Sequence, residues 1–252
     1  MQPRSRTLKG VVLLLMLMAP ALIGCGANRT PGGPPSPSST ATPAPTPSPS
    51  PTLPPTPTPT VTTPAPTQTT PGPGWTVVSS RVAYAWRWPG GDGGATVSHP
   101  RVTPVLLTTI GVGDHPSDPG DRPYNRMSFS FTDGYPSYHF GYVAELVADG
   151  SGQTIPLEGY GALRIVFTPA QAHTMDGTAS TIVSQPPAHL GLARMVSYAR
   201  AGDFEGYLTY GIGITYPIRE SNPQIQVRVY EVTYVNAQQA YRYVVAFDVD
   251  AR

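Results

Sequence analysis

The chain has a single cysteine, Cys25, among its 252 residues. A lone thiol forms no disulfide within the chain and leaves no set of cysteines for a metal ion, so the folded part depends on its own core. Lysine is equally scarce, because Lys9 is the only one. From Trp75 onward acidic residues outnumber arginines. This balance argues against a nucleic-acid partner, which selects basic surfaces.

No apolar run is long enough to span a membrane. The longest, residues 11–23, follows a basic N-terminus and is shorter than the roughly 20 residues of a membrane span. It ends in Leu22-Ile23-Gly24-Cys25. Residues 1–24 therefore resemble a bacterial lipoprotein signal peptide with its lipobox. We predict a thioether-linked lipid on Cys25 that anchors the protein to the extracytoplasmic face of the cell membrane; the alternative is a free thiol beside an ordinary cleavage site.

Residues 30–74 lack charged and aromatic side chains and consist almost entirely of Pro, Thr, Ser, Gly and Ala. Such a segment buries too little apolar surface to offset the entropy of ordering. Proline favours an extended chain at about 3.1 Å per residue. Residues 25–74, which begin with the lipidated cysteine, are thus predicted to be a disordered stalk, with a proline-rich ligand for a partner domain as the alternative.

Residues 75–252 are predicted to form one all-β domain. Segments such as 127–131 and 224–232 alternate apolar and polar side chains with the period of a half-buried strand. Glycine and proline turns, such as 149–152, separate these segments. We therefore predict a β-sandwich-like domain of many short strands. Residues 168–173 begin with Thr-Pro and predict one short helix.

Several segments resemble, in order, those of the AMIN-like domain found in bacterial lipoproteins. The similarity covers roughly residues 124–249, and the segments are 124–131, 140–157, 163–173, 201–206 with 211–213, and 243–249. The Gly-Asp-Phe-Glu-Gly turn at 202–206 together with its ordered neighbours is fairly specific, whereas no single segment is. Asn125 stands where the family usually has aspartate, and residues 75–112 are not placed by the resemblance. The related AMIN domain accompanies cell-wall amidases and secretin components, so the resemblance implies a β module for peptidoglycan or envelope targeting rather than for catalysis.

Motifs for metal or nucleophilic chemistry are missing. No His-x-His, His-Glu-x-x-His or Gly-x-Ser-x-Gly pattern occurs. We therefore predict no metal, no cofactor and no catalytic residue. The three carboxylates of the loop 113–121 are expected to be solvated, as are Asp248 and Asp250 at the end of the last strand.

Two sets of residues are candidates for binding. Asp203 and Glu205 flank Phe204, and we expect Phe204 to fill the core while the two carboxylates hold the turn; an acid–base pair is the alternative. Trp86 and Trp88 share one face if the chain is extended there, so both indoles could stack on wall sugars, or both could pack into the core.

The sequence thus predicts a lipid-anchored, non-catalytic β domain that binds or organises peptidoglycan or a wall-associated protein. Two alternatives remain: a hydrolase that acts on a wall substrate through Asp203 and Glu205, and a structural subunit of a membrane-bound complex.

The lipid on Cys25 can be tested by metabolic labelling with a fatty-acid analogue. The wild-type chain should carry the label, and Cys25→Ala should lose it, because no other thiol is present to take the thioether bond. An unlabelled wild type released into the medium would contradict the prediction.

Overall fold

The computed structural model describes residues 72–90, 93–215 and 225–252, all within the compact unit Thr60–Arg252. The signal segment, Cys25 and the stalk up to residue 71 lie outside the described residues. The described part contains strands and turns but no helix, so it has no helical segment able to cross a membrane.

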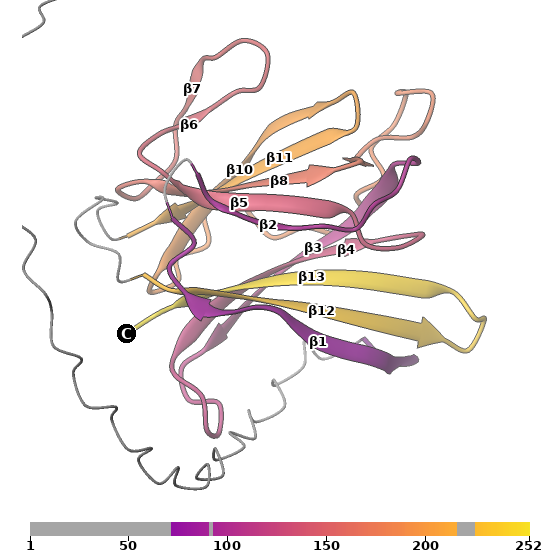
Figure 1. The fold of residues 1–252 in the computed structure, drawn as a ribbon, viewed down its shortest axis with the longest axis horizontal. Helices are drawn as coiled ribbons and strands as arrows, with labels where there is room; N and C mark the ends of the chain where they lie inside the picture. Colours follow the sequence, from indigo (N-terminus) through magenta and orange to yellow (C-terminus); the bar gives the residue numbers. More distant parts are fainter. Residues whose placement is uncertain (1–71, 91–92, 216–224) are drawn as a thin grey trace, which may run out of the picture. The chain divides into compact units, whose positions relative to one another are not determined.

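Most strands belong to two sheets that form two layers (Figure 1). The six-stranded sheet has the order β1-β12-β13-β4-β3-β9. Its strands are β1 (Trp75–Arg87), β12 (Val227–Asn236), β13 (Tyr241–Asp250), β4 (Tyr124–Phe131), β3 (Val105–His115) and β9 (Ala170–Gln171). The five-stranded sheet has the order β10-β11-β8-β5-β2. Its strands are β10 (Met195–Phe204), β11 (Tyr207–Ile214), β8 (Ala162–Thr168), β5 (Ser137–Val143) and β2 (Ala95–Val97). All neighbours pair antiparallel except β3 and β9.

A small hairpin, β6 (Leu146–Val147) and β7 (Thr154–Ile155), projects from the five-stranded layer (Figure 1). Leu146 is buried in a cluster with Ala162 and Ala201, which fixes the hairpin on the outer face of this sheet. Gly211 lies beneath it, and a Cβ there would be 2.5 Å from the Leu146 side chain. The hairpin therefore reaches the sheet because position 211 has no side chain.

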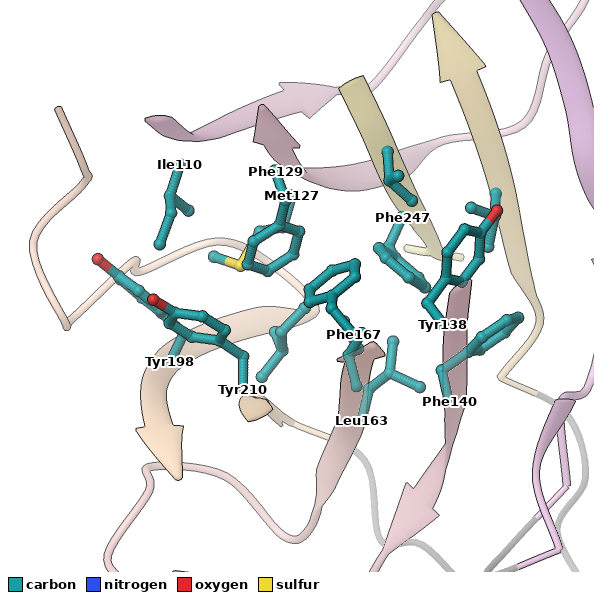
Figure 2. Packing of buried hydrophobic residues seen from close by; sticks show 14 of the residues in the cluster. Ile110, Met127, Phe129, Tyr138, Phe140, Leu163, Phe167, Tyr198, Tyr210 and Phe247 are labelled. Atoms are coloured by element: carbon teal, nitrogen blue, oxygen red, sulfur yellow. The ribbon is translucent and has the colours of Figure 1, made fainter. Parts of the chain in front are cut away.

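The core is an aromatic cluster between the two sheets (Figure 2). Phe129 of β4 and Phe167 of β8 have ring centroids 4.9 Å apart, and Phe247 of β13 lies 6.2 Å from each. All three are fully buried. Burial of one such side chain contributes about 1.5–3 kcal/mol. The predicted all-β, sandwich-like fold is thereby confirmed.

Strand β4 is buried on both of its faces. Met127 and Phe129 face the core, whereas Arg126 and Ser128 alternate with them and are also buried. The outer face of the six-stranded sheet therefore carries a covered polar layer instead of a solvated surface.

Asp248 is the centre of that layer. Its carboxylate accepts hydrogen bonds from Arg126 Nε at 2.5 Å and from Arg228 Nη2 at 2.8 Å, and the residue is fully buried. Asp250 is 5% exposed and accepts a bond from Arg122 Nη1 at 3.0 Å. The expectation that both aspartates face solvent was wrong, because β13 is paired with β12 and β4 on both sides up to its end.

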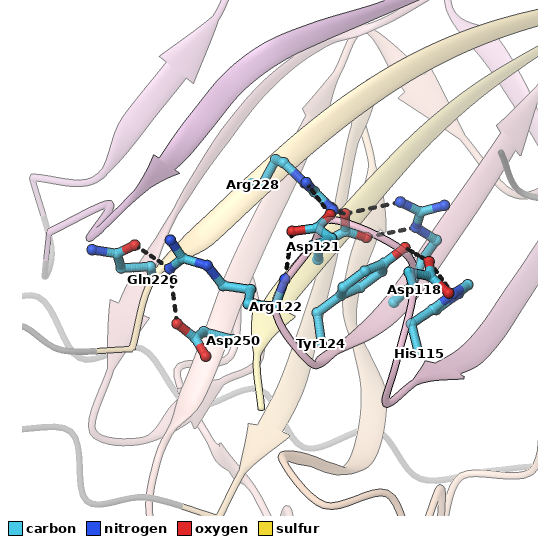
Figure 3. A network of polar contacts seen from close by, with 10 residues as sticks. His115, Asp118, Asp121, Arg122, Tyr124, Gln226, Arg228 and Asp250 are labelled. Carbon is cyan, nitrogen blue, oxygen red and sulfur yellow. Dashed lines mark hydrogen bonds and ion pairs between the residues drawn. The ribbon is translucent and has the colours of Figure 1, made fainter. Parts of the chain in front are cut away.

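The loop after β3 closes over the same layer (Figure 3). Asp121 Oδ2 lies 2.5 Å from Arg228 Nη1, and Asp118 accepts a hydrogen bond from the Tyr124 hydroxyl at 2.6 Å. Asp114 accepts one from Asn125 at 2.7 Å. These carboxylates were expected to be solvated. Asp114, near the end of β3, is exposed, whereas Asp118 and Asp121 are partly buried against partners on the sheet.

The segment predicted to form a short helix is extended instead. After Pro169 the chain enters β9, which pairs in parallel with Val105 and Leu106 of β3. The Ala170 amide donates to the Gly206 carbonyl at 2.9 Å. Pairing with two distant segments satisfies the backbone and overrides the local helix signal.

Replacing Asp248 with asparagine should destabilise the domain by about 3–5 kcal/mol, because two buried guanidinium groups would lose their shared counter-charge. Urea unfolding followed by tryptophan fluorescence measures the change. Asp133→Asn is the matched control, since Asp133 is exposed, has a φ of 63° that asparagine tolerates, and should change stability by no more than about 0.5 kcal/mol. An equal change in the free energy of unfolding for the two variants would contradict a structural role for Asp248.

Candidate functional site

Two aromatic side chains are exposed at the tip of the β10–β11 hairpin. Phe204 pairs with Tyr207 across a two-residue turn. Glu205 and Gly206 have φ values of 50° and 80°, as in a type I′ turn. Because paired residues share a face, both rings lie on the outer face of the five-stranded sheet. Phe204 is 72% exposed and Tyr207 55%, and we call this pair the aromatic tip.

The exposure of Phe204 corrects the expectation that it fills the core. Asp203 pairs with Leu208, which is fully buried, so this pair takes the inward face at the end of the sheet. The alternation of the strand then turns Phe204 outward. The core position assigned to Phe204 belongs to Leu208.

Two grooves share Arg164, and one of them is lined by the aromatic tip. The tip groove has a volume of about 500 Å³ and is lined by Asp149, Gly150, Arg164, Val166, Gly202, Asp203, Phe204, Glu205 and Tyr207. The hairpin groove, of about 400 Å³, is lined by His139, Gly141, Val143, Ala144, Glu145, Val147 and Arg164. Pockets of about 300–1,000 Å³ are typical of ligand sites.

Arg164 lies between two glycines on the outer face of the five-stranded sheet, and the Leu146 side chain occupies the space above one of them. The partners of Arg164 across the sheet are Gly211 of β11 and Gly141 of β5. Arg164 Nη2 donates to Asp149 Oδ1 at 3.0 Å, while its Nε is buried and has no hydrogen-bond partner among the described residues. A guanidinium whose side chain is 32% exposed thus stands between the two grooves.

The two candidate carboxylates differ in their surroundings. Asp203 accepts from the Ala172 amide at 3.2 Å and from Arg200 Nη1 at 3.1 Å, and its side chain is only 8% exposed. Glu205 lies exposed in the turn, and no hydrogen bond or ion pair involves its carboxylate in the described part of the chain. The structure therefore ties Asp203 to its neighbours and leaves Glu205 in solvent.

Trp86 and Trp88 do not lie together. Trp88 packs against the main core, whereas Trp86 is covered by guanidinium groups on the outer face of the six-stranded sheet, with Arg228 4.4 Å and Arg122 4.8 Å from its ring. Register shifts along β1 break the regular alternation that would place them on one face. Both indoles are partly buried. Trp86 is in β1 of the six-stranded sheet and Trp88 follows directly after that strand, so neither is on the strands that carry the aromatic tip.

Within residues 72–90, 93–215 and 225–252, no group of three or more His, Cys, Asp or Glu side chains could hold a metal ion.

A known protein family matches more than half of the chain. The family described as AMIN-like domain matches residues 105–245. The chain belongs to the AMIN-like domain family. No match was found among curated proteins or among solved structures. The matched range begins with β3 and leaves β1 and β2 outside, although β1 completes the six-stranded sheet of this AMIN-like domain.

Sequence reasoning missed Arg164 and Tyr207 in this AMIN-like domain. One signal for Arg164 was available, since it is the only charge in the apolar strand Ala162–Thr168. Nothing local shows that its neighbours across the sheet are glycines, because those pairings join segments far apart in the sequence.

Phe204→Ala should lower the free energy of unfolding by less than about 1 kcal/mol, because little of its ring surface is buried. Phe167→Ala should cost about 3–5 kcal/mol, as is usual for a buried phenylalanine. Urea unfolding of both variants measures the difference. A large loss in Phe204→Ala would mean that the ring is buried in solution.

Proposed function

We propose that this AMIN-like domain is a non-catalytic binding module of the cell envelope whose partner is peptidoglycan. The aromatic tip carries the proposal. Two adjacent exposed rings at a hairpin tip give flat apolar surface for the faces of sugar rings, at little cost in side-chain entropy. The neighbouring Arg164 offers a guanidinium to the carboxylates of wall peptides.

The family supports the same class of partner. AMIN-like domains are in general binding domains of the peptidoglycan type. The two grooves on either side of Arg164 suit an elongated ligand, because they continue from the aromatic tip towards β5 on one sheet face.

A lipid on Cys25 would place the domain on the extracytoplasmic face of the cell membrane. The stalk of residues 25–74 would let it reach away from the bilayer, since a proline-rich chain extends by about 3.1 Å per residue. Anchor, stalk and domain together would tether the membrane to the wall.

A wall hydrolase that uses Asp203 and Glu205 has weaker support. A catalytic carboxylate must reach the substrate. The Asp203 carboxylate is instead engaged by the Ala172 amide and the Arg200 guanidinium. Two other roles remain as alternatives: binding a wall-associated protein, and acting as a structural subunit of a membrane complex. The experiment below distinguishes both from peptidoglycan binding.

Co-sedimentation of the detergent-solubilised full chain with purified peptidoglycan tests the proposal. Replacing both Phe204 and Tyr207 with alanine should weaken binding about tenfold or more, because buried aromatic contacts dominate such interfaces. The same samples are analysed for released wall fragments.

Tyr241→Ala is the matched control, since Tyr241 is 47% exposed on the six-stranded sheet and should leave binding unchanged. No binding by the wild type would overturn peptidoglycan as the partner and favour a protein. Release of fragments that Glu205→Gln abolishes would favour the hydrolase.

A further inference from the structure

A third cleft lies on the opposite side of the β10–β11 hairpin from the aromatic tip. It has a volume of about 620 Å³. One wall is residues 180–188, which we call the strap, and the other is formed by Tyr198, Arg200 and Tyr210. We call the space between them the strap cleft.

The strap is fixed at both ends. The Val183 amide donates to the Thr108 carbonyl at 2.8 Å, and the Ile110 amide donates to the Ser184 carbonyl at 3.0 Å, which ties the strap to β3. At the other end the Tyr198 hydroxyl donates to the Pro186 carbonyl at 2.7 Å. The cleft therefore has a wall held by hydrogen bonds to both sheets.

Tyr210 presents an unused donor to this cleft. The residue is only 2% exposed, yet among the described residues its hydroxyl has no hydrogen-bond partner. Figure 2 shows the hydroxyls of Tyr198 and Tyr210 directed to the same side, away from Phe167. The Tyr210 oxygen is not one of the fully enclosed, unpartnered polar atoms of the described residues, so the hydroxyl reaches the cleft, where it can donate to a ligand group.

Burial keeps this hydroxyl protonated. Desolvation is the main cause that raises the pKa of Tyr210, and it outweighs the lowering effect of Arg200. At neutral pH the phenol is therefore a neutral donor.

Arg200 supplies a positive charge beside that donor. It is the cross-strand partner of Tyr210, so the two side chains share a face. Its Nη1 donates to Asp203, and its side chain remains 49% exposed. The described residues that line the strap cleft include no acidic side chain. A cation and a hydroxyl donor side by side favour an anionic group.

We propose that the strap cleft is a second binding site, which takes a carboxylate carried by an acidic sugar or by a peptide terminus. Arg200 pairs with the carboxylate, and the Tyr210 hydroxyl donates a hydrogen bond to it. Asp203 shares the guanidinium and so favours a singly charged carboxylate over a phosphate monoester of about −1.5 to −2 charge. The hydroxyl of Ser184 and the amide of Gln185 on the strap can bond the remaining polar groups.

Titration of the detergent-solubilised full chain, followed by calorimetry, tests this site. N-acetylmuramic acid and D-alanyl-D-alanine are the acidic probes, and N-acetylglucosamine and D-alanyl-D-alanine amide are their neutral counterparts. At least one acidic probe should bind tenfold or more tightly than its neutral counterpart, and the stronger of the two identifies the source of the carboxylate. Equal binding of acidic and neutral probes overturns the proposal, as does tighter binding of inorganic phosphate.

Tyr210→Phe is the decisive variant. It removes only a hydroxyl that has no partner in the described part of the protein, so its melting temperature should match that of the wild type. Its affinity for the acidic probe should fall about tenfold, in line with one lost hydrogen bond to a charged group. Tyr142→Phe is the control, because the Tyr142 hydroxyl likewise has no partner in the described part of the protein, but it is fully enclosed and does not line the strap cleft. Unchanged affinity in Tyr210→Phe overturns the proposal.

The strap cleft is independent of peptidoglycan binding at the aromatic tip. The Phe204→Ala, Tyr207→Ala double variant should bind the acidic probe as the wild type does, even if it no longer sediments with the wall. If the double variant no longer binds the acidic probe while Tyr210→Phe binds it with unchanged affinity, the carboxylate binds at the tip groove. That result would overturn the proposal that the strap cleft is its site.

Discussion

The contacts of Phe247 with rings of the opposite sheet hold the two layers together. Phe247 lies 5.2 Å from Phe140 and 6.2 Å from Phe167, both on the five-stranded sheet. A chain with one cysteine has no disulfide to supply this link, so the sandwich depends on apolar burial between its sheets. The tip groove and the hairpin groove lie on the outer face of the five-stranded sheet, whereas the strap cleft borders the core at Tyr198 and Tyr210.

The two outer faces differ in what covers them. On the six-stranded sheet, Asp248 binds Arg126 and Arg228, and the loop after β3 adds Asp121, so charged groups there satisfy one another. On the five-stranded sheet, Arg164 bonds only Asp149 among the described residues, and its side chain is 32% exposed. A ligand can therefore approach the second face without breaking an existing ion-pair network.

Asp203 links the two proposed binding surfaces. It lines the tip groove, and its carboxylate holds Arg200, which lines the strap cleft. It also accepts the Ala172 amide just after β9. Sequence reasoning favoured a structural role for Asp203 in the turn, with an acid–base pair as the alternative, and its contacts extend to both sides of one hairpin.

The sequence by itself determined the all-β class, the strands of period two such as Tyr124–Phe131, and the family, because alternation and turn residues are local properties. Trp86, Trp88, Asp203 and Glu205 were named as candidates from local spacing alone. Only the tertiary structure decided that Phe204 is exposed, that Asp248 is buried, and that residues 168–173 join a sheet instead of a helix. Each of these outcomes depends on strand pairing between segments far apart in the chain, and such pairing sets which face of a strand meets the core and which carboxylate meets an arginine.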